Sequence, residues 1–179
     1  MLRLVGSLDR LRGNGHASLQ VYPETDFGRA LEHTARLIHA DVGLEVAALD
    51  LGGWDTHFAQ GGSQRLMARL LAELASGLAA FQADLGSTAA GVTLLTMSEF
   101  GRRVYENGSL GTDHGHSSCM FVIGGGIQGG MVYGQWPRLG EGQLSGPGDL
   151  AVTTDCGDVL AELCAVLRDD TTSDAVSLG

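Results

Sequence analysis

The sequence predicts an α/β fold in which helices flank a mostly parallel sheet, because helical and strand patterns alternate along the chain. Apolar residues recur at helical spacing from Asp26 to His39, and a short apolar run from Leu44 to Leu51 is typical of a buried strand. A second helical pattern from Ser63 to Leu85 leads into another apolar run, Val92 to Met97. The order strand, helix, strand favours parallel pairing through a right-handed crossover.

The remaining elements are predicted from turn and capping residues. Ser63 is a candidate N-cap of the second helix. Met120 to Ile123 is a third strand, and an antiparallel direction would bring its start to the same sheet edge. The glycine-rich stretch that ends at Pro137 is typical of a hairpin or an edge strand. A last helix from Asp155 to Leu167 begins at an Asp155 or Thr154 cap.

Composition limits the classes of protein. The 179 residues suit one domain spanning 1–179, and residues 169–179 form a polar tail that we expect to fray. A formal net charge of −10 argues against a nucleic-acid partner. No apolar run is long enough for a membrane span, and the first twelve residues lack the apolar core of a secretion signal. Three cysteines without a Cys-x-x-Cys pair are expected to be small core residues: Cys119, Cys156 and Cys164.

Three polar clusters carry the candidate chemistry. Asp55 and His57 follow the first predicted strand, Glu99 and Arg102 follow the second, and a loop before the third holds Asp113, His114 and His116. Ligands bind beyond the carboxyl ends of strands in open α/β sheets, so we expect these groups to share one site. Carboxylates and imidazoles without thiolates suit zinc, manganese or iron.

Each cluster also has an ordinary structural interpretation. Asp55 could cap a turn beside a surface His57, the histidines near residue 115 could be solvated, and Glu99 with Arg102 could form a surface ion pair. A different chemical alternative is a histidine acid/base enzyme without metal, which would use His114 or His116.

The strings GGWDTHFAQ, TLLTMSEFGRRVYENGSLGTDHGHSSCMFVIGGGIQGGMVYGQWP and TTDCGDVLAE resemble the bacterial family called domain of unknown function 1501. The resemblance runs from about Tyr22 to Leu167. It implies kinship with the alkaline phosphatase and sulfatase superfamily, and therefore a three-layer sandwich of which this chain resembles the C-terminal part. The implied activity is metal-dependent hydrolysis of a small anionic phosphate or sulfate ester.

Under that resemblance, Asp55, His57, Glu99, Asp113, His114 and His116 line a site for a divalent metal, with zinc first and manganese, iron or calcium as alternatives. Arg102 would stabilise the substrate anion. The chain departs from the superfamily at Glu99-Phe100, where an Asp-His pair usually stands. The nucleophile of the superfamily lies upstream of the portion that this chain resembles.

Two expectations follow from that missing portion. The chain is expected to need the N-terminal segment or a partner chain, and longer relatives are expected to be exported to the periplasm. The alternative function is a non-catalytic exported protein of the same fold that binds a metal or a partner. A nucleophile near an upstream aspartate would favour hydrolysis.

Overall fold

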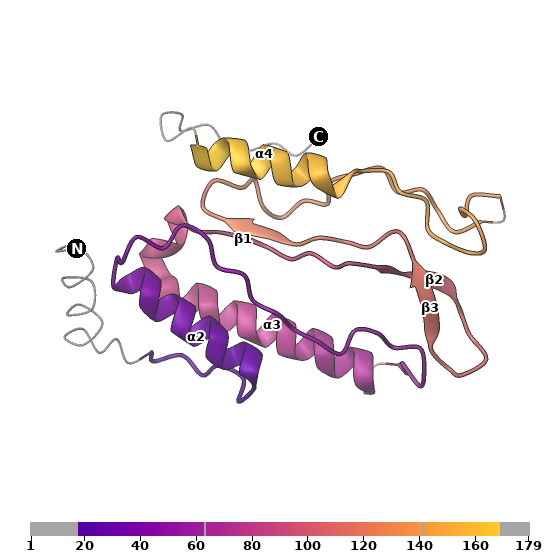
Figure 1. The fold of residues 1–179 in the computed structure, drawn as a ribbon, viewed down its shortest axis with the longest axis horizontal. Coiled ribbons are helices and arrows are strands. Elements are labelled where there is room, and N and C mark those ends of the chain that lie inside the picture. Colours follow the sequence, from indigo (N-terminus) through magenta and orange to yellow (C-terminus); the bar gives the residue numbers. More distant parts are fainter. Residues whose placement is uncertain (1–17, 63, 141, 169–179) are drawn as a thin grey trace. The chain divides into compact units, whose positions relative to one another are not determined.

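The computed structural model describes residues 18–168 apart from 63 and 141. In these residues the chain combines three α-helices with two small antiparallel sheets of two strands each. It divides into two compact units, the first containing residues 18–55 and 61–89 and the second containing 56–60 and 90–168. Figure 1 shows the elements of each unit along the chain.

The first unit is built on helices α2 (Asp26–His39) and α3 (Leu66–Leu85), which pack against each other. Thr25 caps α2, since its hydroxyl oxygen accepts a hydrogen bond from the Gly28 amide at 3.1 Å. The core face of α2 follows a spacing of four residues: Phe27, Leu31 and Ala35. The predicted helix Asp26–His39 is therefore confirmed at both ends.

Polar contacts secure the ends of these two helices. The Tyr22 hydroxyl donates to a carboxylate oxygen of Asp84 at 2.8 Å, and a ring nitrogen of His39 lies 3.1 Å from the Asp84 carbonyl oxygen. Burial and the bond to Asp84 raise the pKa of Tyr22 above its usual value. Asp84 therefore connects the end of α3 to Tyr22, which precedes α2, and to His39, the last residue of α2.

Helix α3 begins two residues later than predicted, after its N-cap Arg65, and the predicted cap Ser63 lies outside the described residues. By length and composition, the segment Leu66–Gly91 is long and apolar enough to cross a membrane, a test that core helices of soluble proteins also pass. Its buried side chains include Leu70, Phe81 and Leu85, and it packs on α2. The absence of a membrane span stays a prediction.

Gly77 allows the close approach of α2 and α3, and replacing it with alanine is expected to destabilise the first unit by about 1 kcal/mol. A Cβ there would lie 2.9 Å from both Leu31 Cδ1 and Phe27 Cε1, two buried side chains. The clash outweighs the helix propensity gained by losing a glycine. Urea unfolding measures the change, and Gly62→Ala, whose Cβ would meet nothing within 4 Å, is the control. A more stable G77A variant would contradict the observed helix packing.

The second unit contains both sheets. Strand β1 (Thr93–Leu95) pairs antiparallel with β4 (Val122–Gly124), and β2 (Gly101–Glu106) pairs antiparallel with β3 (Thr112–Gly115). A 3₁₀ turn over Gly86–Gly91 precedes β1, and helix α4 (Cys156–Arg168) follows the last loop. The predicted strands near 92–97 and 120–123 and the last helix are thus present with small shifts, and the third strand is antiparallel.

Several fold predictions are wrong within the described residues. Residues 44–51 form no strand there, and Leu44, Val46 and Leu49 are exposed. A strand needs a hydrogen-bonded neighbour, which local composition does not guarantee. No parallel pair occurs among the described strands, and the stretch ending at Pro137 contains no strand.

The prediction for the cysteines is also wrong in part. Cys119 and Cys156 are exposed, and Cys164 is half-buried. Cys156 is the first residue of α4, where a helix end meets solvent, so its apolar character does not place it in the core.

Candidate metal centre

The hairpin of β2 and β3 carries one side of the candidate site. Arg102 lies opposite His114 in the antiparallel register, so the two side chains project from the same face. Asn107 organises the turn, since its side-chain oxygen accepts from the amides of Ser109 at 2.9 Å and Gly111 at 3.1 Å. The prediction that residues 113–116 form a loop is therefore wrong for Asp113, His114 and Gly115, which lie in β3.

Residues 56–60 run beside this hairpin and hold His57 there. Phe58 pairs with Leu110 in an isolated antiparallel bridge, and the Thr112 amide donates to the Thr56 carbonyl oxygen at 3.2 Å. The hydroxyls of Thr56 and Thr112 both donate to the Gln60 side-chain oxygen at 2.7 Å. Thr56 is only 2% exposed, so this contact is a buried polar junction. The backbone on both sides of His57 is thereby fixed, although no strand precedes it as predicted.

Three of the predicted ligands come together. One ligand atom from each of Asp55, His57 and His114 lies within 4.8 Å of the others, and all three residues are exposed. One carboxylate and two imidazoles match the donors that bind zinc and other divalent transition metals. The donor set therefore fits a divalent cation.

Ring contacts fix the orientation of His114. The Phe100 ring stacks on the His114 imidazole with a centroid separation of 4.3 Å and an interplanar angle of 8°. The His57 and His114 rings lie 4.7 Å apart at 36°. Packing against Phe100 limits the rotation of a ligand side chain that is otherwise open to solvent.

Arg102 lies on the other end of this ring stack. Its guanidinium carbon is 5.6 Å from the Phe100 centroid, within the range of a cation–π contact. Its Nε donates to the Thr112 hydroxyl oxygen at 2.9 Å, and Nη2 donates to the Thr112 carbonyl oxygen. These contacts orient the guanidinium on the face of the hairpin that carries His114.

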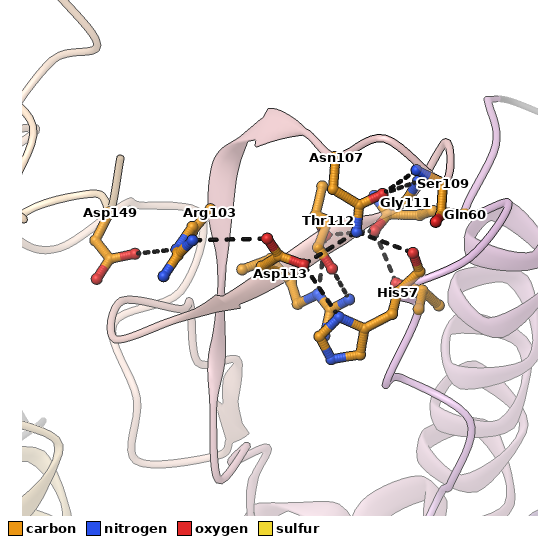
Figure 2. Close-up of polar contacts among 11 residues, drawn as sticks. His57, Gln60, Arg103, Asn107, Ser109, Gly111, Thr112, Asp113 and Asp149 are labelled. Carbon is orange, nitrogen blue, oxygen red and sulfur yellow. Dashed lines mark hydrogen bonds and ion pairs between the residues drawn. The ribbon is translucent and has the colours of Figure 1, made fainter. Parts of the chain in front are cut away.

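Asp113 contacts His57 (Figure 2). Its Oδ1 lies 3.3 Å from His57 Nδ1 and accepts a hydrogen bond from Asn107 Nδ2 at 3.0 Å. The bonds from Asn107 and His57, helped by the positive charge of Arg103, hold the pKa of Asp113 below its usual value. Asp113 is therefore ionised at neutral pH, and its stabilising contribution is lost as pH falls through that lowered pKa.

Arg103 connects Asp113 to a second aspartate–histidine pair. Its Nη1 is 3.6 Å from Asp113 Oδ2 and its Nε is 3.7 Å from Asp149 Oδ1 (Figure 2). The carboxylate of Asp149 is buried and its Oδ2 lies 3.0 Å from Nδ1 of the exposed His116. Arg103 Nε and Asp149 Oδ1 are both buried and make no hydrogen bond, so their interaction is an ion pair.

The other predicted ligands are not members of the three-residue group. Glu99 is exposed in the turn before β2, the Asp113 carboxylate contacts Nδ1 of His57, and His116 pairs with Asp149. Sequence analysis missed Asn107 and Asp149. The Asn107-Gly108 dipeptide is a hairpin signal that points to the first, whereas no local pattern points to Asp149.

Comparison with known proteins identifies one family. The family model described as "Protein of unknown function (DUF1501)" matches residues 11–163, which confirms the resemblance seen in the motifs. No curated protein and no solved structure matches the chain at a significant level.

Proposed function

The chain belongs to the DUF1501 family, and from its site we propose that it is a metal-dependent hydrolase of phosphate or sulfate esters. The observation that carries the proposal is the group formed by Asp55, His57 and His114, with ligand atoms within 4.8 Å. Catalytic zinc sites use three protein ligands and leave a coordination position for water or substrate. The exposure of all three residues gives an ester access to such a position.

In this proposal the metal is zinc first, with manganese, iron or calcium as alternatives. A divalent ion supplies Lewis acidity toward a phosphoryl or sulfuryl oxygen. Arg102 binds the substrate anion, because a guanidinium offers several N–H donors and Arg102 shares a hairpin face with His114. Glu99, Asp113 and His116 are proposed to line the same site, and the sulfatase-like fold and periplasmic export belong to the same proposal.

A second function is favoured by one specific contact. Phe100 stacks on His114 where the sulfatase superfamily usually places a histidine, so an aromatic ring replaces a candidate ligand. This supports a non-catalytic protein of the same family that binds one metal for structure or for a partner. Metal binding alone is common to both functions, and ester hydrolysis distinguishes them.

The test first measures the zinc content of the purified protein and then its ester hydrolase activity. We expect the purified protein, incubated with zinc and desalted, to retain about one ion per chain by elemental mass spectrometry. His57→Ala and His114→Ala are each expected to lose it because two donors remain, whereas His33→Ala on the exposed face of α2 is expected to retain it. Loaded protein is then assayed with 4-nitrophenyl phosphate and 4-nitrophenyl sulfate.

Chelator-sensitive hydrolysis lost in both site variants supports the hydrolase. Stoichiometric zinc without hydrolysis of either ester supports the non-catalytic metal-binding protein. Chelator-insensitive hydrolysis supports a metal-free histidine enzyme instead. Equal zinc retention by H57A, H114A and H33A rejects the site itself.

A further inference from the structure

We propose that Asp113 is a positioning residue that holds the His57 imidazole with Nδ1 protonated, so that Nε2 is the atom presented to a cation. This inference rests on the proposed metal site and assigns a role in it that differs from direct ligation. Its basis is the 3.3 Å contact between His57 Nδ1 and Asp113 Oδ1.

The tautomer follows from the inventory of donors and acceptors. A carboxylate accepts hydrogen bonds, and in a neutral imidazole only one of the two ring nitrogens carries a proton. A hydrogen bond to Asp113 therefore requires the proton on His57 Nδ1. That nitrogen cannot coordinate a metal while it carries the proton, which leaves coordination to Nε2.

Asp113 is itself held on both carboxylate oxygens. Asn107 Nδ2 donates to Oδ1 at 3.0 Å, and Arg103 Nη1 lies 3.6 Å from Oδ2. Contacts at both oxygens fix the orientation of the Asp113 carboxylate. The carboxylate can in turn fix the orientation of the His57 ring that donates to it.

One amide group also aligns His57 and Asp113 with each other. Asn107 Nδ2 donates to the His57 carbonyl oxygen at 2.9 Å as well as to Asp113 Oδ1, as Figure 2 shows. An amide nitrogen carries two protons, and these two acceptors match them. The backbone of His57 and the acceptor of its side chain are thus positioned by the same group.

The first measurement is the tautomer of His57 in metal-free protein, from two-bond ¹H–¹⁵N correlation spectra of the imidazole. We expect protonated Nδ1 in the unmodified protein and a population shift toward protonated Nε2 in Asp113→Ala. A purely structural role for Asp113 would not select a tautomer. Protonated Nε2 in the unmodified, metal-free protein would overturn the proposal.

The second measurement is zinc affinity by competition with a chromophoric chelator. Removing a carboxylate that orients a metal-binding histidine weakens affinity by about 10- to 100-fold, and we expect this for Asp113→Ala. Asp113→Asn keeps an oxygen that can accept the bond and should recover part of the loss. Asp50→Ala, an exposed aspartate outside the cluster, is the control. Equal affinity in the D113A variant and the unmodified protein would overturn the positioning role.

The two measurements separate the proposals. Protonated Nδ1 together with no zinc binding by the unmodified protein rejects the proposed function while it sustains the control of the His57 ring by Asp113. Zinc binding together with protonated Nε2 sustains the metal site and rejects the role of Asp113.

Discussion

Replacing Gly111 with alanine is expected to destabilise the second unit by about 3 kcal/mol or more and to abolish zinc binding. A Cβ at this position would lie 2.3 Å from the carbonyl carbon and oxygen of His57 and 2.5 Å from the Thr56 carbonyl oxygen. These are backbone atoms, so no side-chain rotation relieves the clash. The segment that carries His57 must move away from the hairpin.

The displacement also affects hydrogen bonds around the site. Gly111 follows the turn organised by Asn107, and Thr112 beside it donates its amide to Thr56. Urea unfolding and zinc competition measure the two effects. Gly108→Ala in the same turn is the matched control, because its Cβ would meet nothing within 4 Å. Equal stability and zinc affinity in the G111A and G108A variants would show that residues 56–60 do not lie against this hairpin.

Replacing Asp149 with alanine is expected to cost about 2 kcal/mol, within the range for leaving a buried polar atom without its partner. Asp149 is only 6% exposed, and its carboxylate lies 3.7 Å from Arg103 Nε and 3.0 Å from His116 Nδ1. Without it, the buried Nε of Arg103 loses the carboxylate that lies 3.7 Å away. Arg103 is 35% exposed and keeps a second carboxylate, Asp113, so the cost stays below that of breaking a fully buried ion pair.

Asp149 also belongs to a loop whose backbone is hydrogen-bonded to the hairpin and to Ser117 directly beyond it. Val104 donates its amide to the Gly148 carbonyl oxygen at 3.0 Å, and the Ser117 hydroxyl donates to the Leu150 carbonyl oxygen at 2.7 Å. The midpoint of urea unfolding should therefore fall in D149A and stay nearly constant in Asp158→Ala, an exposed aspartate of α4. A midpoint equal to that of the unmodified protein would mean that the pair contributes no net stability.

The helices could be predicted because their signals are local. The core face of α2 repeats every four residues, and Thr25 stands directly before it, so both ends match the structure. Helix α4 begins after Asp155, whose carboxylate accepts from the Gly157 amide at 2.7 Å. These capping and spacing signals involve only residues that are close in sequence, so they can be read without knowing the rest of the fold.

The sheet could not be predicted to the same extent, because strand pairing depends on distant residues. The run from Leu44 to Leu51 has strand composition and no partner among the described residues, whereas the polar β3 (Thr112–Gly115) pairs with β2 through the Asn107 turn. Hydrogen bonds between backbones decided the outcome in both cases. Apolar composition was the weaker guide.

For the candidate site, the sequence identified residue types better than their roles. Asp55, His57 and His114 were predicted from two clusters that are distant in the sequence, and the pairing of residues 56–60 with the hairpin brings the clusters together. Asp113 and His116 adjoin His114 in the chain, but each contacts a partner that spacing does not reveal: His57 for the first and Asp149 for the second. The direction in which each side chain projects from β3, or from His116 directly after it, determines which partner it contacts.

Arg103 contacts two aspartates, Asp113 and Asp149, so mutations of the residues around it are not expected to act independently. Arg103 faces Asp113, which contacts His57, and it also faces Asp149, which contacts His116. The effects of mutations within one network of charges are generally not additive. The effect of a substitution at His116 should then depend on which residue occupies position 113. Whether a substitution in this network is tolerated therefore depends on the other residues of the network. Such epistasis restricts the order in which these positions can change.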